Sequence, residues 1–216
     1  GQGSGGLSKG YTLEGQALAA WKGGNMGAKD TAPVLATING IEAYKSQFQA
    51  VYKEDANEAN VSKALATYMR TIISRDTAWD RYKAGDANAI SAAAKRGEAL
   101  FEKANCVQCH SGKLFTDMQF HNVGIGMDGD KAKDIGRGKI DKANVRMTGA
   151  FKTPTLRDIT DSAPYFHDGS VATLEEAVRL MVKGGIPNKF LEGDDVLKKN
   201  EFTDAEIADP VSYTHL

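Results

Sequence analysis

The sequence predicts an all-α fold. Apolar residues recur at helical spacing, capping residues precede several of these stretches, and patterns typical of strands are weak. The chain has 216 residues, of which 25% are charged and 23 are glycines, so we expect helices joined by glycine-rich loops. A chain of this length is long enough for one sizeable domain or two small ones.

The charge balance excludes two classes of partner. The formal net charge is −1, so no global field attracts nucleic acid or an anionic membrane. No apolar run approaches the length that spans a bilayer. We therefore expect neither a nucleic-acid partner nor a transmembrane segment.

The first half, residues 1–87, is helix-rich and lacks cysteine and histidine. Helices are expected over about 12–21, 40–51 and 56–77. The last of these has one apolar face at helical spacing, made of Val61, Leu65, Tyr68, Met69, Ile72 and Ile73. The turn-rich segment 84–88 marks the expected domain boundary.

The second half, residues 88–208, begins with a helix over 91–104. Ser91 is its expected N-cap, and Gly97 and Phe101 share a face on which another helix can cross closely. A second capped helix begins at Thr173 and is expected to end near residue 183, at a glycine pair.

A third capped helix begins at Thr203. We expect Pro210 to break this helix, which would lower stability. We expect residues 209–216 to be a non-native tail, which gives His215 no role.

The motif Cys106-Val107-Gln108-Cys109-His110 carries the chemistry. Two cysteines three residues apart on a helical turn can reach two carbons of one porphyrin edge. The next residue then points an imidazole nitrogen at the iron. This pattern is typical of covalent attachment of haem c.

Three other interpretations of the cysteine pair are weaker. A disulfide leaves His110 unexplained, and a thioredoxin-like redox pair needs a βαβ context that is absent. A zinc site needs two more ligands, and the sequence has no second C-x-x-C.

The residues leave the sixth iron ligand open. The candidates are His121, His167 and the six methionines, among them Met127 and Met147 in the glycine-rich region. Met181 shares a helix face with Leu174, Ala177 and Val178, but spacing alone favours a core methionine two to one at this position.

Several blocks of the sequence resemble the bacterial dihaem cytochrome c peroxidases and their relatives, the methylamine-utilisation dihaem enzymes. The match covers most of the chain. Its blocks are 12–17 (TLEGQA), 80–82 (DRY), 95–101 (KRG through LF), the haem motif, 114–117 (LFTD), 120–122 (FHN), 151–157 (FKTPTLR), 163–170 (APYFHDGS) and 173–177 (TLEEA) followed by Met181.

The resemblance implies two cytochrome c-like domains with one haem each, of which this chain carries the second. The first haem motif would lie upstream, and residues 1–87 would be the truncated remainder of the peroxidatic domain. Met181 matches the methionine ligand of the family, so the resemblance favours an iron ligand over a core methionine at this position. It also favours the peroxidase branch, since the methylamine-utilisation enzymes have a tyrosine there. In cytochrome c-like domains the helix over 91–104 would cross the last helix.

The resemblance also implies roles for other residues. Phe166 and Tyr165 would line the haem, and Arg157 is a candidate partner for a haem propionate. Backbone carbonyls of Ser162 and Pro164 match ligands of a calcium ion between the domains.

One departure from the family affects the peroxidatic site. Gln16 matches the glutamine near the peroxidatic haem. The glutamate that follows about ten residues later falls at Asn25, which cannot accept or return a proton as a carboxylate does.

The resemblance implies that the intact protein reduces hydrogen peroxide to water with electrons from a small c-type cytochrome or cupredoxin. The alternatives are a non-enzymatic electron-transfer cytochrome and a dihaem oxidase of another substrate. Covalent haem implies assembly outside the cytoplasm, so we expect a periplasmic location. A homodimer is one possible assembly.

Overall fold

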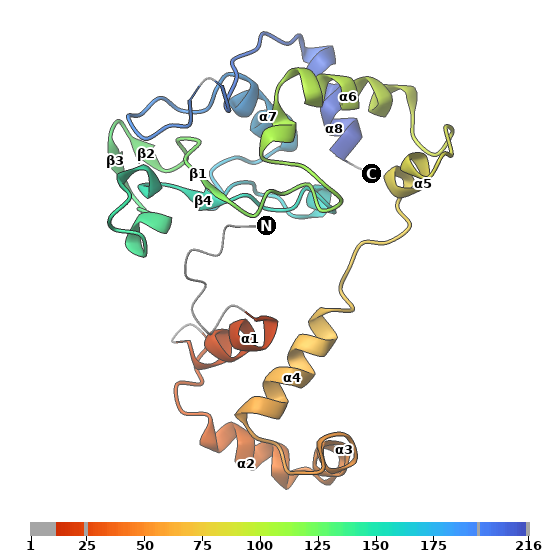
Figure 1. Cartoon of the computed structure of the whole chain (residues 1–216), viewed down its shortest axis with the longest axis vertical. Coiled ribbons are helices and arrows are strands. Elements are labelled where there is room, and N and C mark those ends of the chain that lie inside the picture. Colours follow the sequence, from red (N-terminus) through yellow and green to blue (C-terminus); the bar gives the residue numbers. More distant parts are fainter. Residues whose placement is uncertain (1–11, 24–25, 194, 215–216) are drawn as a thin grey trace. The chain divides into compact units, whose positions relative to one another are not determined.

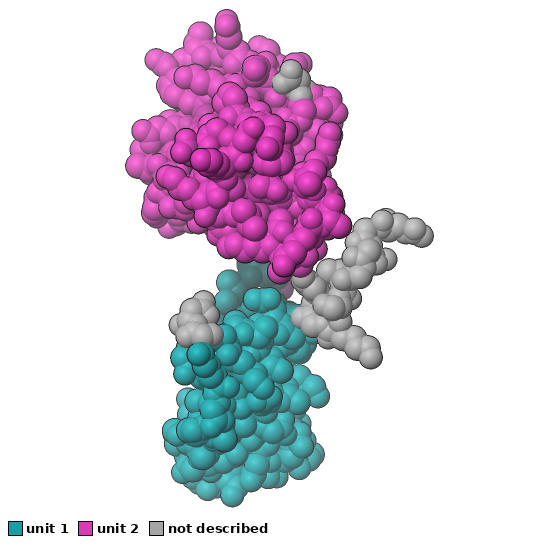
Figure 2. Space-filling view, turned by 90° about the vertical axis from the view of Figure 1, so that its left-hand side faces the viewer, with its two compact units in different colours: residues 1–73 teal, residues 74–216 magenta. Residues whose placement is uncertain are grey.

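A computed structural model describes residues 12–23, 26–193 and 195–214. The chain divides into two compact units, residues 1–73 and 74–216 (Figures 1 and 2). Helices dominate both units, so the all-α prediction is confirmed. The division lies before the turn-rich segment 84–88, because residues 74–83 pack with the second unit.

Four helices build the described part of the first unit. They are α1 (Leu13–Lys22), α2 (Ala32–Gly40), α3 (Glu42–Tyr52) and α4 (Glu58–Met69). The helices predicted over 12–21 and 40–51 are confirmed as α1 and α3. The sequence analysis missed α2, which has Pro33 in its first turn and no side-chain cap at Thr31.

Small side chains fill the contact between α1 and α4. Ala17 of α1 and Ser62 and Ala66 of α4 are buried, and α1 packs against α4. Arg70 and Glu14 add an ion pair of 2.8 Å across the same contact.

The apolar face predicted over 56–77 is only partly used. The helix α4 ends at Met69, and of the six residues on that face only Val61 is buried. Tyr68 is 67% exposed and Ile72 66% exposed.

Over its described residues, the second unit contains four further α-helices, four short 3₁₀ turns and four two-residue strands. In chain order they are α5 (Ala78–Lys83), α6 (Ala92–Lys103), η1 (Cys106–Gln108), β1 (Phe120–His121), β2 (Met127–Asp128), β3 (Lys131–Ala132), η2 (Arg137–Lys139), η3 (Val145–Met147), β4 (Phe151–Lys152), η4 (Ile159–Asp161), α7 (Leu174–Val182) and α8 (Asp204–Thr214).

The helices α6 and α8 form the frame of this unit (Figure 1). The hydroxyl of Ser91 accepts a hydrogen bond from Ala94 N–H and caps α6, and Gly97 and Phe101 are buried, as predicted. A buried cluster of Ala104, Val182 and Ile207 joins α6, α7 and α8. Burial of these side chains is the main stabilising contribution to the frame.

The predicted break at Pro210 is wrong. The helix α8 continues through Pro210 to Thr214. Proline inside a helix costs about 3 kcal/mol, because it removes one backbone hydrogen bond and its ring crowds the preceding turn. Burial of Pro210 and Val211 and a two-bond ion pair between Asp209 and Arg96 of α6, at 2.8 and 2.9 Å, offset this cost. The non-native origin of residues 209–216 stays a prediction.

The predicted limits of α7 are confirmed. Thr173 and Glu176 form a capping box, in which each side chain accepts a hydrogen bond from the other residue's backbone N–H. At the other end Gly185 has φ of 70°, and a Cβ there would lie 2.5 Å from the Val123 carbonyl oxygen. Only glycine allows the chain after α7 to pass so close to the loop at Val123.

Two small antiparallel ladders hold the loops between α6 and α7. Strand β1 pairs with β4, with Phe120 opposite Lys152 and His121 opposite Phe151. Strand β2 pairs with β3. Among the described residues, no helix is long and apolar enough to cross a bilayer.

Truncation of Ile207 tests the frame. Ile207 is 1% exposed, so Ile207→Ala is expected to lower the free energy of unfolding by about 2–5 kcal/mol through lost burial and a residual cavity. Denaturant unfolding followed by circular dichroism measures this. The control Ile140→Ala, at a side chain 72% exposed, is expected to change it by less than about 0.5 kcal/mol. Equal effects would contradict the proposed frame.

Candidate haem site

A single turn brings the motif residues together. After α6 ends, Asn105 adopts a left-handed conformation with φ of 68°, which asparagine tolerates better than most residues. Its side-chain amide donates to the carbonyls of Asp195 and Val196, both at 2.9 Å. The turn η1 follows, and His110 N–H donates to the Cys106 carbonyl at 2.8 Å. Cys106, Cys109 and His110 therefore lie on one closed turn whose start is anchored to a distant loop.

Both cysteines are free thiols in partly buried positions. Cys106 packs against the Ala104, Val182 and Ile207 cluster. Burial raises the pKa of the Cys106 thiol to about 11. An uncharged sulfur suits this apolar position, as a thioether would.

The ring of His110 is oriented by one hydrogen bond. Its Nδ1 lies 2.9 Å from the carbonyl oxygen of Phe115, so Nδ1 carries the proton and Nε2 is the nitrogen left to bind a metal. Burial, the largest effect, lowers the pKa of His110. A metal ligand must be the neutral imidazole, so both features fit an axial ligand.

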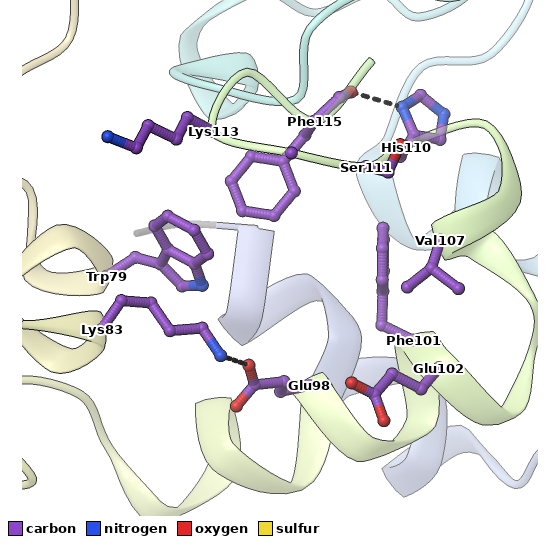
Figure 3. Close-up of a pocket in the computed structure, with 11 residues that line it drawn as sticks. Trp79, Lys83, Glu98, Phe101, Glu102, Val107, His110, Ser111, Lys113 and Phe115 are labelled. Atoms are coloured by element: carbon purple, nitrogen blue, oxygen red, sulfur yellow. Dashed lines mark hydrogen bonds and ion pairs between the residues drawn. The ribbon is translucent and has the colours of Figure 1, made fainter. Parts of the chain in front are cut away.

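A cavity of about 370 Å³ lies beside His110 (Figure 3). Trp79 and Lys83 reach it from α5, Phe101 reaches it from α6, and Phe115 reaches it from the loop after η1. The rings of Trp79 and Phe115 meet edge to face at 4.8 Å, and those of Phe101 and His110 lie 6.5 Å apart. An ion pair between Lys83 and Glu98 closes one side. The cavity beside the His110 ring is therefore lined by both aromatic and charged side chains.

The donor set fits haem c. Two free cysteines and an oriented neutral imidazole on one turn are the groups that covalent attachment and axial ligation require. The apolar cluster behind Cys106 and the aromatic rings beside His110 suit a large apolar macrocycle.

Family comparisons agree with this donor set. The family model described as di-haem cytochrome c peroxidase matches residues 7–88, and the cytochrome c model matches residues 94–215. A solved structure of a MauG-like protein associated with microbial copper homeostasis is 30% identical, with a TM-score of 0.82, and the match covers 94% of this chain and 67% of that one. The chain belongs to the di-haem cytochrome c peroxidase family.

Curated relatives fall in two groups. The methylamine utilization protein MauG of Methylophilus methylotrophus is 36% identical over 207 residues, which is 94% of this chain and 60% of the relative. The cytochrome c peroxidase Ccp of Escherichia coli K12 is 34% identical over 175 residues, which is 79% of this chain and 37% of the relative. The chain thus spans little more than a third to three fifths of the length of these relatives.

Met181, the predicted methionine ligand, lies half-buried in the last turn of α7, beside the buried Val182. Its ligation of iron stays a prediction. Two other candidates for the sixth iron ligand, His121 and His167, make contacts of their own. His121 has both ring nitrogens beside carboxylates, and the His167 ring stacks on Phe151 with centroids 3.5 Å apart.

Arg157 makes interactions that the sequence analysis did not foresee. Its guanidinium forms two hydrogen bonds with Asp80, at 2.7 and 3.1 Å, and Nε donates to the Lys113 carbonyl at 2.6 Å. It also lies over the ring of Trp79, 5.5 Å from the centroid. Arg157 therefore fixes α5 to the loop after the haem motif, and its pairing with a propionate stays a prediction.

The remaining predicted site residues are dispersed. Phe166 is half-buried with φ of 65°, whereas Ser162 and Pro164, the predicted calcium ligands, are exposed. Gln16 is exposed on α1, and its predicted partner position Asn25 lies outside the described residues. The roles assigned to these residues stay predictions.

The structure reveals a cluster that the sequence analysis missed. The donor atoms of Cys109, Asp117 and His121 lie within 4.8 Å of one another, and Glu192 contacts His121 from the other side. Hydrogen bonding to Cys109, opposed by burial and supported by Asp117, raises the pKa of His121 to about 10. The sequence shows only that Asp117 and His121 are four positions apart. It does not show that Glu192, 71 positions further along, contacts His121.

Acid unfolding tests the Asp80–Arg157 pair. The hydrogen bonds from Arg157 are the main cause that lowers the pKa of Asp80 from 3.8 to about 2. A carboxylate with a lowered folded-state pKa contributes stability above its unfolded pKa of about 3.9, and this contribution is lost as pH falls through the folded value. Asp80→Asn is expected to be less stable than the parent at pH 7, and the gap should narrow between about pH 4 and pH 2.

Denaturant unfolding at a series of pH values measures this gap. The control Asp128→Asn removes an exposed carboxylate on β2 and should show no such narrowing. A gap for Asp80→Asn that is constant with pH would contradict the assignment.

Proposed function

We propose that this chain holds one haem c as the electron-transfer centre of a di-haem protein, and that the intact protein reduces hydrogen peroxide to water. The observation that carries the proposal is the closed turn that joins Cys106, Cys109 and His110, with His110 Nδ1 bonded to the Phe115 carbonyl. The family membership supports it.

Each motif residue has a separate task in this proposal. Cys106 and Cys109 would hold the haem covalently, and His110 Nε2 would bind its iron. A haem iron bound here supplies one-electron redox chemistry. The Phe115 carbonyl keeps the imidazole in one orientation and makes it a stronger donor. Trp79, Phe101 and Phe115 contribute aromatic surface to the cavity beside it.

Met181 is the proposed second axial ligand. The capping box at Thr173 and the turn at Gly184 and Gly185 fix α7 at both ends, which limits the movement of a side chain in its last turn. A thioether ligand favours a higher reduction potential, which suits a centre that receives electrons. Gln16, which matches the glutamine near the peroxidatic haem of the family, would belong to the site of peroxide reduction.

Other roles in the proposal follow from the family. The electron donor would be a small c-type cytochrome or a cupredoxin, and the protein would act in the periplasm. Phe166 would line the haem, Arg157 would contact a propionate, and the carbonyls of Ser162 and Pro164 would contribute to a calcium site. A homodimer remains one candidate assembly.

A second candidate function is oxidation of another substrate. It is favoured by the 36% identity to a methylamine utilization protein, which extends over 94% of this chain. Residue 181 distinguishes peroxide reduction from oxidation of another substrate. The methylamine-utilisation enzymes have a tyrosine ligand at this position, whereas this chain has Met181. A purely electron-carrying cytochrome is the third candidate, because Asn25 replaces the expected glutamate.

The absorption spectrum of the haem-loaded chain tests the proposal. The chain is produced in a host with haem-attachment machinery, and its ferric form is expected to be low-spin with the far-red band of methionine ligation. Hydrogen peroxide should leave this spectrum unchanged. Met181→Ala is expected to abolish the far-red band and to open the iron to peroxide, because alanine cannot ligate iron.

Matched methionine variants are the controls. Met127→Ala and Met147→Ala remove two of the other candidates and should retain the far-red band. Loss of the band in either of these, or its persistence in Met181→Ala, would assign the ligand elsewhere. A high-spin parent chain that responds directly to peroxide would overturn the proposed division of roles.

A further inference from the structure

Two charged side chains, Asp117 and His121, lie beside the Cys109 sulfur, and Glu192 contacts His121 from the other side. His121 Nε2 lies 2.8 Å from Asp117 Oδ2, and His121 Nδ1 lies 3.1 Å from Glu192 Oε1. The sulfur of Cys109 is within 4.8 Å of the nearest donor atoms of Asp117 and His121. We call Asp117, His121 and Glu192 the charged triad.

The geometry of the charged triad fixes its charges. A carboxylate oxygen accepts a hydrogen bond and does not donate one, so each ring nitrogen of His121 must carry a proton. A histidine with two protonated nitrogens is a cation. The charged triad therefore combines one positive and two negative charges.

The backbone holds the charged triad against the haem motif. Asp117 N–H donates to the Cys109 carbonyl at 2.7 Å. Glu192 N–H donates to the carbonyl of Asn122 at 3.1 Å, and His121 is held by pairing of β1 with β4. Each of the three side chains keeps a position that is set by neighbouring backbone.

Solvent weakens these charges only in part. The side chains of His121, Asp117 and Glu192 are 20%, 18% and 24% exposed. Charges that are largely buried interact through a lower effective dielectric than charges in water, and salt screens them less. A porphyrin joined to the Cys109 sulfur would therefore experience the field of each member.

We propose that the charged triad sets the reduction potential of the haem attached at Cys109, with His121 raising it and Asp117 and Glu192 lowering it. The inference rests on the proposed attachment of haem at Cys109. Ferric iron carries one more positive charge than ferrous iron. A nearby cation therefore destabilises the ferric form, and a nearby anion stabilises it.

Opposite shifts of the midpoint potential test the inference. The haem-loaded full chain and the variants His121→Gln, Asp117→Asn and Glu192→Gln are titrated by spectroelectrochemistry. The titrations are run at about pH 5, well below the ordinary histidine pKa of about 6.5, so that His121 keeps its charge beside the one carboxylate that remains in each carboxylate variant. His121→Gln is expected to lower the midpoint potential, and both carboxylate variants are expected to raise it.

Exposed residues of the β2–β3 hairpin provide matched controls. Lys131→Gln removes a positive charge and Asp128→Asn a negative one, both from exposed positions. Neither should move the potential as far as the corresponding triad variant, because solvent screens exposed charges.

Different results would overturn the inference and the proposed function. Loosening of the haem site by any of the three variants would shift the potential in one common direction, which would overturn the inference. An unchanged potential in both carboxylate variants would overturn it as well, even where His121→Gln fails to fold. Failure of the parent chain to bind haem covalently, seen by haem staining of a denaturing gel, would instead remove the proposed function.

Discussion

The hydrogen bond between His110 Nδ1 and the Phe115 carbonyl is the constraint on which the site depends. It joins the end of the haem motif to the loop that follows, and it decides which ring nitrogen can bind iron. The same loop meets Trp79 through the Phe115 ring and Arg157 through the Lys113 carbonyl. Through these two contacts, helix α5 and the segment after β4 are held against the loop that orients His110.

The frame of α6, α7 and α8 supports that turn from behind. Ala104 caps the end of α6 two residues before Cys106, and Cys106 packs on the cluster that Ala104 shares with Val182 and Ile207. Since Met181 precedes Val182 on α7, the cluster also fixes the helix that carries the proposed second ligand. One apolar cluster therefore constrains both sides of the proposed haem.

Local signals explain what the sequence could predict. Ser91 and Thr173 cap their helices as their residue types indicate, and the spacing of Cys106, Cys109 and His110 identifies the turn. Long-range partners were not predictable, because Arg157 meets Asp80 across 77 positions and His121 meets Glu192 across 71. The break expected at Pro210 failed for a related reason. Proline weakens a helix through local effects that the sequence shows. The burial and the Asp209–Arg96 ion pair that stabilise α8 are tertiary contacts, which the sequence does not show.

The Asp80–Arg157 pair and the charged triad, neither of which the sequence analysis predicted, would affect a bound haem in different ways. Asp80 and Arg157 cancel each other's charge and connect elements, so their effect is chiefly one of position. The charges of the charged triad do not cancel, because one imidazolium faces two carboxylates. An unbalanced, partly buried charge beside Cys109 would act on the iron of a haem attached there, whichever second ligand that iron has. The motif therefore specifies attachment, whereas residues distant in sequence supply the field in which the haem would work.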